Sequence, residues 1–212
     1  VGFLSDSIDE ILEAEKATRN LGLALEAIGQ KKYLSGLLEE ATELSQKFNN
    51  LYDNDEIAQA QTEFVKYGKV TRQELKQLTE VSIELASKLG IDVVSASNKV
   101  IDILAGRGAS TLRDFGLSTK DAKTETERMN LVLVDLANKV KGASVAYADS
   151  AEGIKKQNEL IIANTKEQIG EKLLPIYIDM LKGINDLLSG EMDKIGKIML
   201  KGTISAQTLI SP

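Results

Sequence analysis

Apolar residues recur at steps of three and four along almost the whole chain, and glycines interrupt the pattern at intervals. This spacing places apolar side chains on one face of an α-helix, and a glycine after the last repeat is a frequent helix end. Only 4% of the 212 residues are aromatic, which is typical of helical rather than sheet proteins. The sequence therefore predicts an all-α protein: a compact multi-helix bundle followed by a long, kinked helix.

Residues 1–68 are predicted to form amphipathic helices. Ser7 and Glu10 have the spacing of a capping box, in which each side chain satisfies a backbone amide of the first helical turn. We therefore expect a helix over about residues 5–28, with one face buried and Gly29 as its stop.

A second helix is expected over about residues 32–52, with a coiled-coil-like repeat at Leu34, Leu37, Ala41, Leu44, Phe48 and Leu51. Because the repeat is short, we favour packing within the chain's own bundle over a coiled coil between chains. A third helix is expected over about residues 55–67. Gly68 ends it, and we place a soft domain boundary there, with a simple turn between helices as the alternative.

Residues 69–142 are predicted to form a compact helical bundle. Two further capping boxes, Thr71 with Glu74 and Thr124 with Glu127, mark helix starts. The helices between them are short and regularly interrupted by glycine, so they bury a face only by packing together. The expected buried positions are Leu75, Leu78, Leu85, Leu89, Val93, Val100, Ile103, Leu104, Met129, Val132, Leu136 and Val140.

Residues 143–189 are predicted to form one long helical region. Pro175 lies inside it, and because proline lacks an amide donor and crowds the preceding turn, we expect a kink that divides the helix near Pro175. Residues 190–212 form a weakly patterned tail without a firm assignment. The apolar residues of the helix that share a face are Ile162, Ile169, Leu173, Ile176, Met180, Ile184 and Leu187.

Three polar residues of this helix, Asn158, Thr165 and Lys172, recur at seven-residue spacing. Polar residues on a helix seam can fix the register of associating helices. The alternative, which we favour, is that these residues face water while the opposite side of the helix is buried.

The chain contains no histidine and no cysteine, so the commonest general base and the nitrogen and sulfur metal ligands are missing. Gly106 and Gly108 resemble part of a phosphate-binding loop, but Thr111 occupies the third glycine position and no strand is predicted before them. We interpret them as a helix connection. The sequence predicts no catalytic, cofactor-binding or metal-binding residue, no cofactor, and therefore no enzyme.

Asp53 and Asp55 begin like a calcium-binding loop. The next ligand position, the required glycine and the closing glutamate are replaced by Ile57, Ala58 and Phe64. The motif therefore fails, and we expect these carboxylates, like most others in the chain, to lie on polar helix faces.

The formal net charge of −6 argues against direct nucleic-acid binding, since phosphates would be repelled. The same acidity argues against membrane contact, for which the segment Ile176–Leu200 would be the candidate. No stretch is apolar enough for a membrane span. Because the chain begins with Val1 and not with methionine, it is either processed or a piece of a longer polypeptide, and we expect the second.

The order of the short motifs in the second half of the chain resembles the helical domain of bacteriophage tail tape measure proteins. The motifs of its first part are Leu89-Gly90-Ile91, Ala105-Gly106 and Leu112-Arg113-Asp114-Phe115-Gly116-Leu117. Those leading into the long helix are Ala143, Ala146, Ala148-Asp149-Ser150, Gly153, Ile169-Gly170-Glu171 and Leu173-Leu174-Pro175. The resemblance spans about residues 62–190, and residues 1–61 carry no part of it.

This resemblance implies a structural protein of the virion tail interior, present in the host bacterial cytoplasm during assembly. It implies roles in tail assembly, in tail length determination and in genome ejection. The implied partners are other copies of the chain, tail tube proteins, tail tip or baseplate proteins, and tail assembly chaperones. Being partly compact, this segment would be an anchor or folded module rather than the ruler itself.

A protein of a different class fits the same periodicity: a non-viral cytoplasmic helical adaptor or scaffold, whose amphipathic faces bind partner helices. The length of the parent polypeptide would distinguish the two. A tape measure parent should extend for hundreds of helical residues on one or both sides of this segment.

Overall fold

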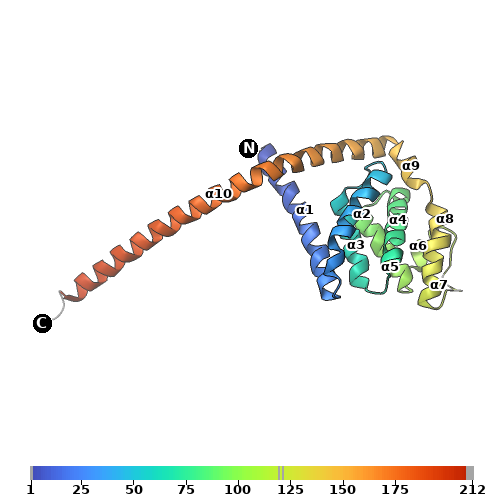
Figure 1. The fold of residues 1–212 in the computed structure, drawn as a ribbon, viewed down its shortest axis with the longest axis horizontal. Helices are drawn as coiled ribbons and strands as arrows, with labels where there is room; N and C mark the ends of the chain where they lie inside the picture. The colour runs from blue at the N-terminus through green and yellow to red at the C-terminus, as the bar shows by residue number, and fades with distance from the viewer. Residues whose placement is uncertain (1, 119, 121, 209–212) are drawn as a thin grey trace.

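The computed structural model describes the backbone of residues 2–118, 120 and 122–208, and the side chains of residues 6–118, 120 and 122–189. Within these residues the chain forms helices and turns and no strand, which confirms the predicted all-α class. Figure 1 shows a compact bundle and a long C-terminal helix that leaves it.

Four helical elements of the N-terminal region lie on one side of the bundle (Figure 1). They are α1 (Gly2–Ala27), the 3-10 turn η1 (Lys31–Tyr33), α2 (Leu34–Lys47) and α3 (Asn54–Tyr67). The capping box predicted at Ser7 and Glu10 is wrong, because α1 begins at Gly2 and both residues lie inside it. Ser7 is fully buried, so tertiary packing extends the helix upstream of the local capping signal.

The second helix is shorter than predicted, because α2 ends at Lys47 rather than near residue 52. Asn49 and Asn50 follow with positive φ angles of 58° and 51°, a conformation that asparagine tolerates better than most residues. The turn still buries Leu51 completely. The third helix matches its prediction, and Gly68 closes it with a φ of 76°.

The remaining bundle helices are α4 (Arg72–Leu89), α5 (Val93–Leu104), α6 (Ala109–Asp114), α7 (Glu125–Asn130), the π-helical turn η2 (Leu131–Leu136), α8 (Ala137–Val140) and α9 (Ala143–Ala148). Both predicted capping boxes are present, with the Thr71 hydroxyl accepting from the Glu74 amide and the Thr124 hydroxyl from the Glu127 amide. In each box the glutamate accepts a hydrogen bond from the threonine amide in return. These local signals therefore place the starts of α4 and α7 correctly.

One hydrophobic core joins the residues before and after Gly68. α3 packs against α1 and α2 on one side and against α5 on another. Gly68 is thus a turn between helices that share a core, and the domain boundary expected there is not a structural one. Of the core positions predicted for residues 69–142, Leu89 differs: it is 37% exposed, because it is the last residue of α4, at the turn made by Gly90.

A clamp from α4 fixes the turn before α9. The Glu84 carboxylate accepts hydrogen bonds from the amides of Gly142, at 3.1 Å, and Ser144, at 2.8 Å. Gly142 has a φ of 80°, and the two bonds satisfy amides that the first turn of α9 would otherwise leave unpaired.

The long helix α10 (Ala151–Thr208) begins later than predicted, because α9 and α10 are separate helices. Ser150 forms the junction: its hydroxyl donates to the Tyr147 carbonyl at 2.6 Å and accepts from the Gly153 amide at 3.0 Å. A side chain at Gly153 would overlap the Tyr147 carbonyl, so the tight turn requires glycine there.

The prediction that Pro175 divides the long helix in two is wrong. The helix is continuous through it, and its axis curves in Figure 1 near the place where it crosses α1. Pro175 is exposed, so the surroundings tolerate the distortion that a proline imposes. The backbone of residues 190–208, part of the tail left without assignment, continues α10, and residues 209–212 lie outside the described residues.

Candidate interaction surface

The half of α10 that projects from the bundle exposes a dense group of large apolar side chains. Their exposed fractions run from 37% for Tyr177 to 71% for Leu187. Isolated exposed apolar residues are normal on soluble proteins, whereas contiguous patches mark interaction surfaces. The members are Ile176, Tyr177, Ile178, Met180, Leu181, Ile184, Leu187 and Leu188. We call this group the α10 stripe.

The α10 stripe contains a heptad-like line of apolar residues, and no charged residue occupies a position of this line. Steps of three and four connect Leu174, Tyr177, Leu181, Ile184 and Leu188. Met180 and Leu187 flank this line on one side, at positions that are often charged in two-stranded coiled coils. The apolar face is therefore wider than a two-residue seam and fits a partner surface made of several helical elements.

The charges of the projecting segment lie on the opposite side of the helix. Asp179, Lys182 and Asp186 follow one another at steps of three and four, and Asp179 and Lys182 form an ion pair at 3.9 Å. Among the described residues of this segment, the central line of the stripe, from Leu174 to Leu188, is therefore free of charged side chains, which lie beyond its edges.

The same side of the helix lies on the bundle in the first half of α10. Gly153, Lys156, Ala163, Glu167 and Gly170 are buried or half-buried and continue the three-and-four spacing toward the α10 stripe. Outward-facing Ile161 and Ile162 remain 62% and 57% exposed. The docking face thus continues into Tyr177, Leu181, Ile184 and Leu188 of the stripe, whereas Ile176, Met180 and Leu187 continue the outward line of Ile162.

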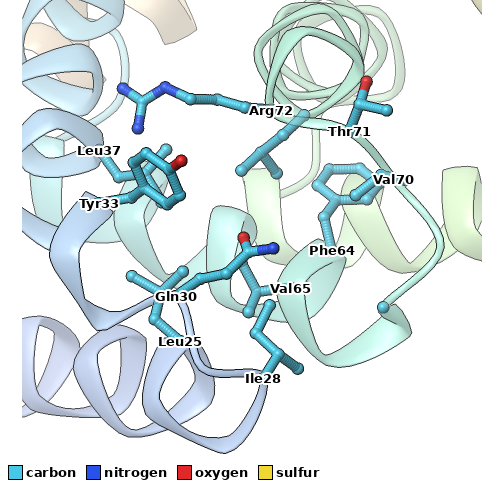
Figure 2. A pocket seen from close by; sticks show the side chains of 12 residues that line it. Leu25, Ile28, Gln30, Tyr33, Leu37, Phe64, Val65, Val70, Thr71 and Arg72 are labelled. Carbon is cyan, nitrogen blue, oxygen red and sulfur yellow. The ribbon is translucent and has the colours of Figure 1, made fainter.

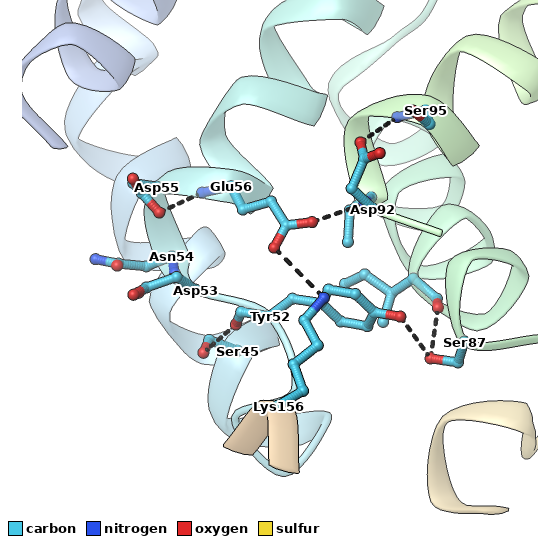
Figure 3. Close-up of polar contacts among 12 residues, drawn as sticks. Ser45, Tyr52, Asp53, Asn54, Asp55, Glu56, Ser87, Asp92, Ser95 and Lys156 are labelled. Atoms are coloured by element: carbon cyan, nitrogen blue, oxygen red, sulfur yellow. Dashed lines mark hydrogen bonds and ion pairs between the residues drawn. The ribbon is translucent and has the colours of Figure 1, made fainter. Parts of the chain in front are cut away.

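Lys156 anchors α10 to the bundle through two contacts, as Figure 3 shows. Its ammonium lies 3.9 Å from the Glu56 carboxylate and 3.8 Å from the centre of the Tyr52 ring. Burial lowers the pKa of Lys156, while the neighbouring Glu56 carboxylate acts in the opposite direction. We call Lys156, Glu56 and Tyr52 the lysine clasp.

The lysine clasp, which includes Glu56 of α3, is connected to two other helices. The other Glu56 oxygen accepts a hydrogen bond from the Val93 amide at 2.8 Å, which ties α3 to the start of α5. The Tyr52 hydroxyl lies 3.1 Å from the Ser87 hydroxyl of α4. Burial raises the pKa of the Glu56 carboxyl, and Lys156 opposes this shift. A change at the clasp therefore also affects the contacts that α3, α4 and α5 make there.

A second docking point lies where α1 crosses α10. A side chain at Gly170 would overlap the Ser7 carbonyl of α1 and would also touch Ile11, so the two helices approach at backbone distance. One turn earlier, Lys166 contacts the Asp6 carboxylate at 3.3 Å.

The two carboxylates that begin the incomplete calcium-binding motif lie at the start of α3 and bond to its backbone. Asp53 caps α3 by accepting from the Asn54 amide at 2.7 Å, and Asp55 accepts from the Glu56 amide at 2.6 Å. Across the described part of the chain, no group of three or more carboxylates is placed to hold a metal ion. Ile57 and Phe64, which replace calcium ligands in the failed motif, are core residues.

Gly106 and Gly108 form the turn between α5 and α6, as expected for a helix connection. Gly106 has a φ of 81°, and a side chain at Gly108 would overlap Ile103. The Arg128 guanidinium donates to the Leu104 carbonyl at 2.6 Å and thereby satisfies the end of α5.

Asn158, Thr165 and Lys172 are all exposed, which agrees with the interpretation that they face water. The Thr165 hydroxyl donates to the Ile161 carbonyl of its own helix at 2.7 Å. In this structure they therefore form no helix seam within the chain.

The cavity in Figure 2 lies between the end of α1, η1, α2, α3 and the start of α4. Its volume is about 130 Å³, and its walls include Leu25, Leu37 and Phe64. Arg72 covers one side, with its guanidinium 5.4 Å from the centre of the Tyr33 ring. Ordinary small-molecule pockets measure roughly 300–1,000 Å³, so this cavity is a packing crevice.

Within the described residues, none of the helices is both long and apolar enough to cross a membrane. Comparison of the chain with protein-family models, curated proteins and solved structures finds no match. The interaction surface is therefore interpreted from its own geometry.

Proposed function

We propose that this chain is a structural segment of a bacteriophage tail tape measure protein, without catalytic activity of its own. It would act in tail assembly, tail length determination and genome ejection. Its place would be the interior of the virion tail and, during assembly, the host bacterial cytoplasm. Its partners would be other copies of itself, tail tube and tail tip or baseplate proteins, and tail assembly chaperones.

The observation that carries this proposal is the projection of α10 from the bundle with the α10 stripe uncovered (Figure 1). The helix has 58 residues, which at about 1.5 Å per residue corresponds to a rod of about 87 Å. A helix has a nearly fixed length per residue, so an extended helix can set a distance in an assembly. The ordered helical motifs at residues 62–190 add the family resemblance described above.

The α10 stripe suits a second copy of the same chain. Two identical chains with a net charge of −6 repel each other in general, but the stripe contains no charge, so identical faces can meet without repulsion. Asp179, Lys182 and Asp186 would remain in water on the outside of such a contact. Large apolar side chains would leave water on association, which is the main driving force for helix pairing in solution.

The experiment that tests the proposal is quantitative mass spectrometry of purified tail-containing particles from the bacterium that encodes the chain. Peptides of this segment are compared with those of the tail tube subunit. We expect a few copies of the segment per particle, far fewer than copies of the tube subunit. Absence from assembled particles, with recovery in other cytosolic complexes, would overturn the proposal and favour the adaptor or scaffold function.

A further inference from the structure

Three carboxylates gather where α3, α1 and α10 meet. A hollow of about 460 Å³ is lined by Asp55 of α3 and Glu167 of α10, together with Glu15 and Arg19 of α1. A second hollow, of about 300 Å³, is lined by Asp53, Glu167 and Glu171. Glu167 therefore lies between Asp53 and Asp55, the two acidic residues at the start of α3 (Figure 3 labels both).

These three carboxylates make no ion pair with any described residue. The cations nearest in the chain are engaged elsewhere: Lys166 pairs with Asp6, and Lys156 pairs with Glu56. Arg19 of α1 faces the first hollow, but Glu15 faces it too. Glu10 and Glu13 of α1 and Glu171 of α10 add negative charge around the three, and the α2 residues that line the second hollow are uncharged.

Among the described residues, α1 packs against α10 more extensively than any other element does, but no side chain of α10 joins the hydrophobic core of the bundle. The polar and close contacts of this half of α10 are the lysine clasp, the Lys166 pair and the backbone contact at Gly170. Ile154, Ile161 and Ile162 are at least half exposed, so they contribute little buried apolar area to docking. Charge repulsion between facing carboxylates therefore acts on a helix that the hydrophobic core does not hold.

We propose that residues 151–174 of α10 are a releasable arm, held on the bundle by the lysine clasp and the Gly170 contact and opposed by the facing carboxylates of Asp53, Asp55 and Glu167. Acidification docks the arm, and ionisation of the carboxylates loosens it. Release uncovers the docking face, which then joins the α10 stripe in one continuous surface. The inference concerns the fold itself and holds whether or not the proposed function is correct.

The direction follows from proton binding. Burial, and next the Asp53 carboxylate, raise the pKa of Asp55 from 3.8 to about 6, and burial with Asp53 and Asp55 raises the pKa of Glu167. Release would take Glu167 away from Asp53 and Asp55, so the docked state binds a proton at Glu167 more tightly than the released state does. The charges that raise the pKa of Asp55 belong to α3 and α1 and stay in place. Docking is favoured below the ordinary pKa of glutamate, and this stabilisation is lost as the pH rises through the raised pKa of Glu167.

The test is a distance measurement by electron paramagnetic resonance. The chain has no cysteine, so Ser35→Cys on α2 and Thr165→Cys on α10, both at exposed positions, accept spin labels at two defined sites. We expect a narrow distance distribution at pH 5 and a broad, longer one at pH 8. Far-ultraviolet circular dichroism at both pH values verifies that the labelled chain is folded.

Charge variants separate this mechanism from a general effect of pH. Glu167→Gln, and independently Asp55→Asn, remove one facing charge and should keep the distribution narrow at pH 8. Asp186→Asn is the matched control, since it removes one negative charge from α10 beyond the bundle, and it should behave like the unsubstituted chain. An unchanged distribution between pH 5 and pH 8, or equal broadening in Glu167→Gln and Asp186→Asn at pH 8, would overturn the proposal.

Discussion

Lys156 holds α10 on the bundle with one charged group that has both an ionic and an aromatic partner. The side chain is 27% exposed, so its contact with the Tyr52 ring is partly desolvated. Cation–π contacts strengthen as water is removed, reaching about 2 kcal/mol in desolvated sites. A single residue therefore supplies much of what fixes the start of the long helix.

We expect Lys156→Met to lower the free energy of unfolding by about 1–2 kcal/mol, since it keeps an apolar side chain but removes the ammonium and leaves Glu56 without its ion-pair partner. Lys155→Met is the matched control. Lys155 is 75% exposed and pairs only with Glu159 of its own helix, so its loss should cost less than about 0.5 kcal/mol. Urea denaturation of both variants measures the difference, and equal losses would contradict the role given to Lys156.

Single residues were predictable from the sequence where their partners are close in the chain. The boxes at Thr71 and Thr124 join residues three positions apart, and both are present. The box at Ser7 has the same local pattern but fails, because packing of α1 decides where that helix begins. The lysine clasp gave no signal, since Lys156 and Glu56 lie far apart in the chain and only the fold brings them together.

At the scale of elements, glycines decide how closely the helices approach. Gly170 lets α10 touch the backbone of α1, whereas Gly183, on the projecting half of the same helix, has nothing near the position of a side chain. The two glycines are thus a natural pair for comparing packing with helix propensity.

We expect Gly170→Ala to separate α1 from α10, because its methyl group would overlap the Ser7 carbonyl. Hydrogen exchange measured by mass spectrometry should show faster exchange in the first turns of α1. Gly183→Ala should leave α1 unchanged and stabilise the exposed helix by roughly 0.5–1 kcal/mol, the usual difference in helix propensity. Unchanged exchange of α1 in Gly170→Ala would show that the close contact is not needed.

Most elements could be predicted from the period of the apolar residues and from the glycines that follow them. The errors have physical causes in particular residues. Ser150 starts a new helix through two side-chain hydrogen bonds, so α9 separates from α10. Pro175 was expected to divide the helix, but it lies in an exposed part of α10, where no packing amplifies its distortion.

The whole molecule consists of a bundle with one shared hydrophobic core and one long helix that extends beyond this core. Many core positions could be predicted, because burial leaves a clear period in the sequence, but Tyr52, Ile83 and Leu112 are buried without having been among them. The apolar face of α10 was also visible in the sequence, but its exposure was not, since the period of a helix does not reveal whether its partner belongs to the same chain. The α10 stripe is the consequence: a continuous apolar face that the bundle does not cover.

The central claim is that the α10 stripe is an assembly surface, and sedimentation equilibrium of the purified chain over a range of concentrations tests it most directly. Leu181→Glu with Ile184→Glu places two negative charges in the stripe. Lys182→Glu changes the net charge by the same amount on the opposite face, where the side chain is 71% exposed, and serves as the matched control.

We expect the unsubstituted chain and Lys182→Glu to associate as the concentration rises, and the Leu181→Glu, Ile184→Glu double variant to remain a monomer with an unchanged circular dichroism spectrum. Association weakened to the same extent in both variants would point to overall charge instead of the stripe. An unsubstituted chain that stays monomeric at every concentration, or a double variant that associates as strongly as it, would contradict the claim.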